Sequence, residues 1–207
     1  MNLQTLASHT VDIDLLPEAP LVLDVGCRWF DFTRGILAHR PKARVWCLDP
    51  STDVRWEPDL ELGRVGLFHL ALVGDDRFAT NFAEGIAGDG GGNLVVDDRE
   101  TFGDYKIKRV LCVNLQKFMQ LQKIERFDCI KLDCEGSEFG IIENLVGQVA
   151  TQISVEFHDW TGPWKEHGCE RAMARLHSLG YRAVQHELSK QGNGVGHWDS
   201  LFVLDVK

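Results

Sequence analysis

Residues 126–145, RFDCIKLDCEGSEFGIIENL, constrain the fold more than any other part of the chain. The segment begins with an apolar run of the length of a buried strand, and this run stops at Asp133. Glu135 and Gly136 follow closely and open an amphipathic helical pattern. In open α/β sheets, ligands bind in the crevice beyond the carboxyl ends of the strands. We therefore expect Asp133 and Glu135 to lie at a ligand site.

Strand-like and helix-like segments alternate along the rest of the chain. Further strand patterns cover residues 21–25, 44–48, 67–73, 110–115, 152–158, 181–186 and 200–206. Helical patterns cover residues 30–39, 116–123 and 170–179. This repeated order predicts an α/β fold, a three-layer αβα sandwich with a mostly parallel, doubly wound sheet. The last two strands are joined by a glycine-rich link, which predicts an antiparallel C-terminal hairpin at the sheet edge.

Length and composition favour one domain. With 207 residues, of which 44% are hydrophobic and 26% charged, the chain can bury one sizeable core. We expect a single domain over residues 1–207, with an N-terminal extension at 1–19 and an inserted flap or hairpin at 76–106. The glycine-rich stretch 85–93 in this flap is either a lid over the site or a plain flexible connection, and the plain connection is favoured.

Charge and hydropathy exclude several classes of partner. The net charge of −9 argues against a sequence-independent grip on nucleic acid, which needs a basic face. The chain has neither the roughly 18 to 20 consecutive apolar residues of a membrane helix nor a signal-peptide pattern. We expect a cytoplasmic protein that acts on a small molecule and binds neither nucleic acid nor membrane; a homo-oligomer stays open. The six cysteines form no C-x-x-C pair, which predicts reduced thiols in the core.

Two acidic residues end the first two predicted strands. Asp24 is followed by Gly26, which lets the backbone approach a ligand. Asp49 lies about 20 residues further on, where nucleotide-binding α/β folds place an acid that bonds ribose hydroxyls. The alternatives are an ordinary turn between strand and helix at Asp24 and a solvated acid before Pro50 at Asp49. Taken together, the two acids favour a nucleoside site.

The turn after the first strand lacks the glycines that a dinucleotide needs. After Gly26 no glycine occurs until Gly35, so a pyrophosphate has no glycine cradle there. S-adenosylmethionine (SAM) carries no phosphate and requires acids for its ribose and amine, and an apolar slot for adenine. The residues therefore favour SAM over a nicotinamide cofactor, and an NAD oxidoreductase is the least supported of the functions considered.

Several sequence motifs resemble one family, in the family's order. KLDCEGSE closely resembles the K-[IL]-D-x-E-G-x-E signature of the FkbM family of SAM methyltransferases. LVLDVGCRWFDFT is similar to the first motif of that family, VWCLDPS to its second-strand motif, and LFHLALVGDD to its third strand and turn. VLCVNLQKFM, ISVEFHDW and GHWDSLFVL resemble three later segments. The resemblance covers nearly the whole chain from Leu21.

This resemblance implies a class I methyltransferase fold with a seven-stranded sheet and SAM as the cofactor. It also implies transfer of methyl to a hydroxyl oxygen of a small polar metabolite or sugar. The cofactor-binding residues that it implies are Asp24, Gly26, Cys27, Arg28, Asp49, Pro50, Ala71, Leu72 and Asp133. The alternative is a catalytically degenerate module of the same fold that only binds SAM or a nucleoside.

Two residues of the first motif depart from the family pattern. Arg28 stands where the family has asparagine, and Phe30 stands where it has a second glycine. One hypothesis is that Arg28 pairs with the methionine carboxylate of SAM through a charge-assisted hydrogen bond. Phe30 either fills the cofactor pocket, as in a degenerate relative, or packs under the first helix. Core packing is favoured, because aromatic residues at such turns most often bury apolar area.

The candidate catalytic residues lie at strand ends on one rim of the sheet. Asp133, Glu135 and His158 are the expected catalytic groups, as a base or as a clamp on the acceptor hydroxyl. Glu135 and Glu138 can instead cap the following helix, and His158 can be an ordinary core or rim histidine. We expect no metal. The alternative ligand set is Asp133, Glu156 and His158, with Glu135 nearby, although its spacing is not compact.

An aromatic segment, HDWTGPW, follows the strand pattern that ends at His158. Trp160 and Trp164 are rich in apolar surface for a loop, and tryptophan rings stack on sugars or planar acceptors. Anchoring of the loop to the core is an equal alternative. His197 and Trp198 are expected in the closing hairpin. The identity of the methyl acceptor cannot be read from these residues, because specificity resides in such loops.

Overall fold

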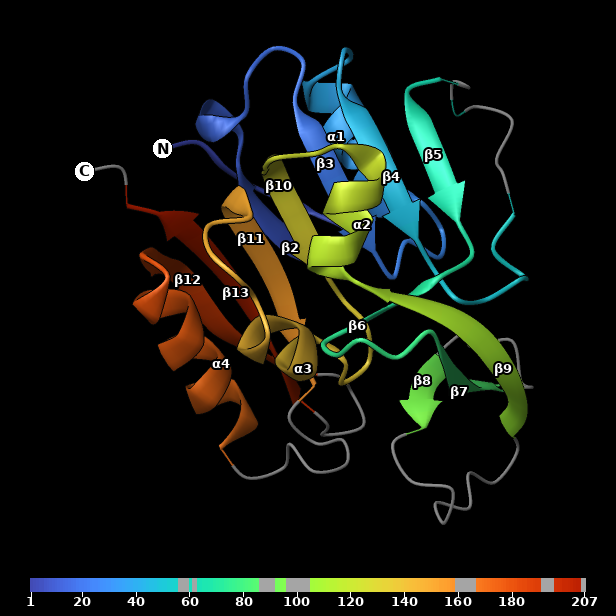
Figure 1. The fold of residues 1–207 in the computed structure, drawn as a ribbon. Coiled ribbons are helices and arrows are strands. Elements are labelled where there is room, and N and C mark those ends of the chain that lie inside the picture. Colours follow the sequence, from blue (N-terminus) through green and yellow to red (C-terminus); the bar gives the residue numbers. More distant parts are fainter. Residues whose placement is uncertain are drawn as a thin grey trace.

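The fold is described here from a computed structural model. It describes residues 1–55, 60, 63–85, 92–95, 105–158, 167–190 and 196–205. A seven-stranded sheet with the order β12-β13-β11-β10-β3-β4-β5 forms the centre of the molecule (Figure 1). Its strands are β3 (Leu21–Val25), β4 (Arg44–Leu48), β5 (Val65–Phe68), β10 (Phe127–Leu132), β11 (Ala150–Phe157), β12 (Tyr181–Lys190) and β13 (Gly196–Leu204).

The pairing of these strands agrees with the predicted mostly parallel sheet. Strands β5, β4, β3, β10 and β11 are parallel, whereas β13 runs antiparallel to both β11 and β12. The chain order proceeds from β3 to β4 and β5 on one side, and β10 and β11 lie on the other side. The switch point of a doubly wound sheet, where ligands bind, therefore lies at the carboxyl ends of β3 and β10.

Helices cover both faces of the sheet (Figure 1). Alternate residues of the strands are buried on the two faces. Helix α1 (Asp31–His39) lies on one face, and α2 (Leu115–Gln122), α3 (Glu138–Glu143) and α4 (Gly168–Ser178) lie on the other. Val22 belongs to the hydrophobic cluster under α1, whereas its neighbour Leu23 belongs to the larger cluster under α2, α3 and α4. This alternation follows from the period of two in a strand.

The predicted strand at residues 67–73 is wrong as a single element. The chain forms β5 in the large sheet, breaks at His69 and Leu70, and continues as β6 (Ala71–Val73) in a second sheet. At the break, the Leu70 amide donates to the Phe68 carbonyl (2.9 Å), which closes a tight turn. The His69 Nδ1 lies 2.9 Å from the Ser51 carbonyl oxygen. The run contains little signal for such a break, because both halves are apolar and only His69 interrupts them.

The second sheet has the order β6-β9-β7-β8 and lies below the carboxyl ends of β4 and β5 in Figure 1. It adds β7 (Ala79–Gly85), β8 (Gly92–Val95) and β9 (Tyr105–Asn114). Strands β7 and β8 pair antiparallel, as the predicted hairpin requires. The predicted strand at 110–115 corresponds to the second half of the longer β9, except that Leu115 begins α2. Most of the glycine-rich stretch 85–93 lies outside the described residues.

The first 19 residues, predicted only as an extension, form ordered structure. Strands β1 (Leu3–Leu6) and β2 (His9–Asp12) make an antiparallel hairpin, followed by a 3-10 turn, η1 (Ile13–Leu15). The hairpin is attached to the sheet through Gln152 of β11. The Asp12 amide donates to the Gln152 side-chain oxygen (2.9 Å), and the Gln152 amide group donates to the Asp12 carbonyl (3.0 Å).

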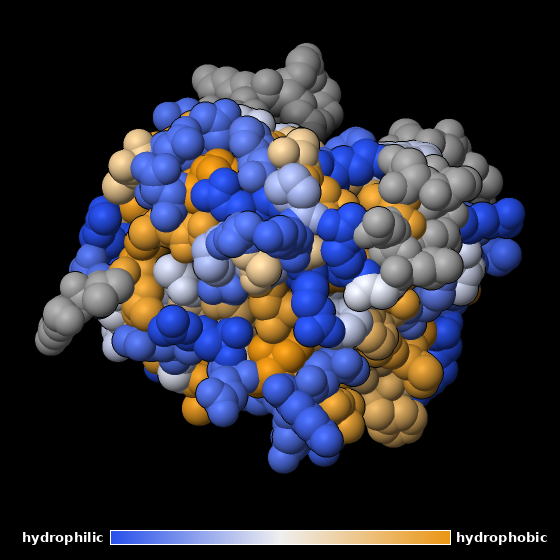
Figure 2. Space-filling model, turned by 90° about the horizontal axis from the view of Figure 1, so that it is seen from above, coloured by the Kyte–Doolittle hydropathy of each residue, from blue (hydrophilic) through white to orange (hydrophobic). Residues whose placement is uncertain are grey.

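The surface at the amino ends of the parallel strands mixes hydrophilic and hydrophobic residues (Figure 2). Among the described residues, no helix is long and apolar enough to cross a membrane.

The six cysteines are free thiols, as predicted, and four of them, Cys27, Cys47, Cys112 and Cys129, are buried.

Candidate active site

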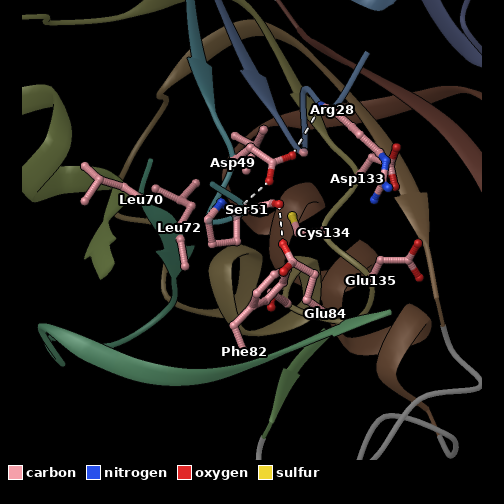
Figure 3. Close-up of a pocket in the computed structure, with 15 residues that line it drawn as sticks. Arg28, Asp49, Ser51, Leu70, Leu72, Phe82, Glu84, Asp133, Cys134 and Glu135 are labelled. Carbon is pink, nitrogen blue, oxygen red and sulfur yellow. Dashed lines mark hydrogen bonds between the residues drawn. The ribbon is translucent and has the colours of Figure 1, made fainter. Parts of the chain in front are cut away.

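A pocket opens where the carboxyl ends of β3, β4 and β10 face the second sheet (Figure 3). It holds about 710 Å³ of space, its open mouth included. Its lining residues are Val25, Gly26, Arg28, Asp49, Pro50, Ser51, Leu70, Ala71, Leu72, Phe82, Glu84, Asp133, Cys134, Glu135 and Ser137.

Apolar and acidic side chains occupy different ends of this pocket. Figure 3 shows Leu70 and Leu72 at one end and Asp133 and Glu135 at the other, with Asp49 between them. The apolar end is suited to a flat heterocycle, because burial of such a ring needs apolar contact on its faces. The acidic end is suited to a cation or to hydroxyl groups.

Asp49, at the end of β4, is held by two backbone amides. One carboxylate oxygen accepts from the Arg28 amide (3.2 Å) and the other from the Ser51 amide (2.9 Å). Burial raises the pKa of Asp49 above its ordinary value, and the two amide bonds only partly offset this effect. The carboxylate is therefore fixed in place but incompletely stabilised, and a hydroxyl donor from a ligand would stabilise it further.

Gly26 is required at its position for two reasons. Its φ of 76° lies in the left-handed region that favours glycine. A Cβ at this position would also collide with the backbone carbonyl of Asp133. The close approach of these two segments brings the end of β3 and the end of β10 together under the pocket.

Asp24 does not line this pocket, in contrast to the expectation from the sequence. Its side chain is fully buried on the α1 face of the sheet, where Thr33 Oγ1 donates to it (2.7 Å). Asp24 is paired across the strands with Lys131, whose Nζ lies 3.3 Å from its carboxylate. Strand alternation explains the position, because Val25 faces the pocket and its neighbour Asp24 must face away. Cys27 is also buried and does not line the pocket.

Lys131 is a buried cation under the pocket that was not among the predicted site residues. Its Nζ donates to the Gly26 carbonyl (2.6 Å) and also lies 3.3 Å from Asp133 Oδ2. Burial opposes the charge of Lys131, but Asp133 and Asp24 outweigh it and raise the pKa of the lysine. Burial likewise opposes the charge of Asp133, and Lys131 outweighs it and holds the pKa of Asp133 well below its usual range. Asp133 is therefore an anion and a weak proton acceptor.

Glu135 occupies a different environment from Asp133. Its side chain is 32% exposed, and burial raises its pKa to about 7, against the opposing effect of His158. Its backbone has a φ of 52°, which costs a non-glycine residue roughly 1–2 kcal/mol. Such strain is concentrated at functional positions. Among the predicted catalytic residues, Glu135 is thus the carboxyl group best suited to take a proton near neutral pH.

His158 does not line the pocket but lies against its acidic end. Its Nε2 is 3.8 Å from Asp133 and 3.6 Å from Glu135, and its Nδ1 is 3.1 Å from the fully buried Glu138. Burial opposes the charge of His158, but the carboxylates, Glu138 foremost, outweigh it and hold its pKa well above the usual value. A histidine in this state is a hydrogen-bond donor and not a base. Glu138 also accepts from the Gly136 amide (2.9 Å), so it organises the loop before α3.

The alternative metal set of Asp133, Glu156 and His158 is not the grouping that the structure forms. Two compact groups share Asp133 instead. His9, Asp133 and Glu156 form one, and Asp133, Glu135 and His158 form the other, each with its ligand atoms within 4.8 Å of one another. His9 comes from the N-terminal hairpin, and no sequence pattern connected it with the site.

The two departures from the family motif have different surroundings. Arg28 lines the pocket, and its guanidinium lies 5.1 Å from the centre of the Trp29 ring. Phe30 is 1% exposed, lies in the hydrophobic cluster under α1 and does not line the pocket. The favoured interpretation of Phe30 as a core residue therefore agrees with its position.

Three further lining residues are not among the predicted site residues. Phe82 and Glu84 come from β7, and Ser51 donates a short hydrogen bond to the Glu84 carboxylate. The second sheet is thus joined to the loop after β4 at the pocket wall. Trp160 and Trp164, for which stacking on an acceptor and anchoring of the loop are equal alternatives, lie outside the described residues.

Comparison with protein families gives one match. The model described as the methyltransferase FkbM domain matches residues 26–183. The chain belongs to the FkbM methyltransferase family. This membership confirms the predicted family and its SAM-dependent methyl-transfer activity, with SAM as the cofactor. A comparison with functionally curated proteins gave no significant match.

Solved structures show the class I methyltransferase fold for this FkbM domain. TrmK of M. capricolum, in complex with S-adenosylhomocysteine, has a TM-score of 0.55 at 10% identity, over 93% of this chain and 66% of that chain. The Methanococcus jannaschii fibrillarin pre-rRNA processing protein has a TM-score of 0.54 at 10% identity, over 96% of this chain and 71% of that chain. Magnesium protoporphyrin IX methyltransferase of Synechocystis PCC 6803 with bound SAM has a TM-score of 0.50 at 12% identity, over 93% of this chain and 72% of that chain. At these identities the likeness concerns the fold, and the predicted fold class is confirmed.

Proposed function

We propose that this FkbM-family protein transfers the methyl group of SAM to a hydroxyl oxygen of a small polar acceptor. The observation that carries this proposal is the position of Glu135, a partly exposed carboxyl group at the acidic end of the cofactor pocket. An oxygen acceptor must lose a proton as it attacks, and a carboxylate in this position can receive it.

The proposed cofactor pose follows the polarity of the pocket. Adenine lies at the apolar end between Leu70, Leu72 and Phe82, and the ribose hydroxyls donate to Asp49. The methionine end lies over Gly26 beside Arg28, whose guanidinium offers a partner for the methionine carboxylate. The sulfonium then points its methyl group toward Asp133 and Glu135. Negative charge at this end favours a bound cation such as a sulfonium.

Asp24 has a supporting role in this pose. It holds Lys131, which in turn donates to the Gly26 carbonyl and lies beside Asp133. Asp24 thereby acts as a positioning residue for the cofactor loop and does not touch the cofactor.

The transfer itself is an in-line displacement. The acceptor oxygen forms a bond to the methyl carbon while the carbon–sulfur bond breaks, and sulfur keeps the bonding electrons to give neutral S-adenosylhomocysteine. The hydroxyl proton passes to Glu135. The contribution of the chain is alignment of oxygen, carbon and sulfur together with removal of this proton. Asp133 and His158 are less suited to accept it, since Lys131 and Glu138 respectively hold them in their charged forms.

The test is incubation of the protein with SAM and a panel of hydroxylated metabolites and sugars, with detection of S-adenosylhomocysteine. Glu135→Gln is expected to lower the turnover at least ~100-fold, the usual contribution of a general base, without changing the affinity for S-adenosylhomocysteine. Glu125→Gln, at an exposed glutamate between α2 and β10, is the matched control and should retain full activity. Binding without turnover on any acceptor would favour the degenerate module, which the replacement of the family asparagine by Arg28 supports.

A further inference from the structure

Asp133 and Glu156 place two acidic side chains next to each other on neighbouring strands. Strands β10 and β11 are parallel with Leu132 opposite Val155. Asp133 directly follows the end of β10, and Glu156 is the next residue within β11. Like charges on neighbouring strands destabilise a sheet unless a cation lies between them. The Glu156 side chain is only 11% exposed, so water screens this repulsion poorly.

His9 points its ring at these two carboxylates from the N-terminal hairpin. It is the first residue of β2 and is 2% exposed. Its Nε2 lies 3.5 Å from Asp133 Oδ2 and 3.9 Å from Glu156 Oε2, which is ion-pair distance for a protonated imidazole but longer than an ordinary hydrogen bond. Within the described part of the chain, this buried nitrogen has no hydrogen-bond partner. An unsatisfied buried polar atom costs about 1–3 kcal/mol, so a ligand that bonds to this nitrogen would stabilise the fold.

We infer that His9, Asp133 and Glu156 form a binding site for one divalent metal ion. The separation of 3.5 Å between His9 Nε2 and Asp133 Oδ2 is close to the ~3.4 Å expected for two ligands of a tetrahedral ion with bonds of ~2.1 Å. His9 Nε2 lies 3.9 Å from Glu156 Oε2, and the three ligand atoms lie within 4.8 Å of one another. One imidazole and two carboxylates suit Zn²⁺ or Mn²⁺ better than Mg²⁺, which prefers oxygen ligands alone.

The surroundings of this site orient its ligands. The other ring nitrogen of His9, Nδ1, lies 3.4 Å from Ser154 Oγ on β11. The second carboxylate oxygen of Glu156 lies 3.3 Å from His158 Nε2, and His158 is itself fixed by Glu138. Partners of this kind, one layer outside the ligands, hold metal-binding side chains in place.

Lys131 is the neighbouring positive charge that competes for Asp133. Its Nζ lies 3.3 Å from the same Asp133 oxygen that faces His9. Lys131 also has the Gly26 carbonyl at 2.6 Å and the buried Asp24 carboxylate at 3.3 Å. These two partners keep the lysine satisfied when Asp133 turns toward an ion.

A metal ion at this position would have a direct use in methyl transfer. Three protein ligands leave a coordination position open for water or a substrate oxygen. Asp133 also lines the cofactor pocket, so a hydroxyl bound to the ion would lie next to the transferred methyl group and would lose its proton more readily. This use rests on the proposed function, whereas binding of the ion does not.

The test uses the full chain after treatment with a chelator. Calorimetric titration with MnCl₂, ZnCl₂ and MgCl₂ should show one ion per chain, with Mg²⁺ the weakest. Co²⁺ should give a visible absorbance band that reports a nitrogen ligand. His9→Ala and Glu156→Gln should each lower the affinity for Mn²⁺ and Zn²⁺ at least 10-fold. His39→Ala, at an exposed histidine of α1, should bind like the wild type.

Thermal melting identifies any variant that fails to fold. If His9→Ala unfolds, Glu156→Gln remains as the test, because glutamine keeps the shape of the glutamate side chain. Absence of binding by the wild type would overturn the inference, as would wild-type affinity in folded His9→Ala or Glu156→Gln. Titration of the metal-free chain with S-adenosylhomocysteine is a separate measurement. Binding of that compound without any metal binding would refute the metal site and leave the proposed function standing.

Discussion

Replacement of Lys131 by methionine tests the buried ion pairs that Lys131 makes with Asp24 and Asp133 under the pocket. Lys131 and Asp24 are paired across β10 and β3 at 3.3 Å, with side chains 4% and 0% exposed. Methionine fills a similar volume but leaves the Asp24 carboxylate buried without its cation. Removal of one partner from a buried pair costs about 3–5 kcal/mol. With a urea dependence of roughly 2–3 kcal/mol per molar, the unfolding midpoint should fall by about 1–2.5 M.

The double variant Lys131→Met/Asp24→Asn provides the sharper comparison. Asparagine keeps an oxygen that accepts from Thr33 and removes the uncompensated charge, so the double variant should be more stable than Lys131→Met alone. The double variant should still be less stable than the wild type, because Asp133 has also lost its ion pair with Lys131. The assay is urea unfolding followed by tryptophan fluorescence. Lys117→Met, at an exposed lysine of α2, is the control and should lie within about 0.5 kcal/mol of the wild type. Additive losses in the double variant, or a loss under 1 kcal/mol in Lys131→Met, would refute the ion-pair reasoning.

Three further predictions concern the cofactor loop, the ribose acid and the hairpin turn. Gly26→Ala should abolish S-adenosylhomocysteine binding in calorimetry, because a Cβ there meets the Asp133 carbonyl; undiminished affinity would refute the close approach. Asp49→Asn should weaken SAM binding about 10- to 100-fold, the value of a charged hydrogen bond. Burial raises the pKa of Asp49, so the wild-type affinity should fall as pH drops through a value above 3.8, whereas this dependence should be absent in Asp49→Asn. Because the folded-state pKa is raised, the contribution of Asp49 to stability is fully present below its unfolded pKa and is lost as pH rises through the folded pKa. Ala7→Asn/Ser8→Gly should raise the unfolding free energy by about 1–2 kcal/mol, since both turn residues have positive φ (48° and 70°). An unchanged melting temperature would contradict that assignment of strain.

The order of strands and helices could be predicted because each element carries its own periodicity. Strands β4 and β3 have the predicted bounds of 44–48 and 21–25, α1 begins one residue later than predicted, and α2 begins and ends one residue earlier than predicted. The third strand could not be predicted, because its two halves are both apolar and the turn at His69 and Leu70 depends on contacts with the loop after β4. Pairing of β6 with β9 is likewise a long-range event that local pattern does not encode.

The candidate site was predictable where a residue directly follows a strand. Gly26, Asp49 and Asp133 lie at the pocket for that reason. The sequence motif predicts Asp24 in the pocket, but the period of two in a strand turns its side chain toward α1. Lys131 is paired with Asp24 on the neighbouring strand and faces the same side. His9 joins Asp133 and Glu156 from more than 100 positions away in the chain. Such a contact follows from the packing of the hairpin on β11 and has no signature in the local sequence.

The most direct measurement of the central claim is calorimetric titration of the purified chain with S-adenosylhomocysteine, in parallel with Asp49→Asn. One molecule should bind per chain, with clearly weaker binding in the variant. Failure of the wild type to take up this compound, or equal affinity in wild type and Asp49→Asn, would contradict the assignment of this pocket to SAM.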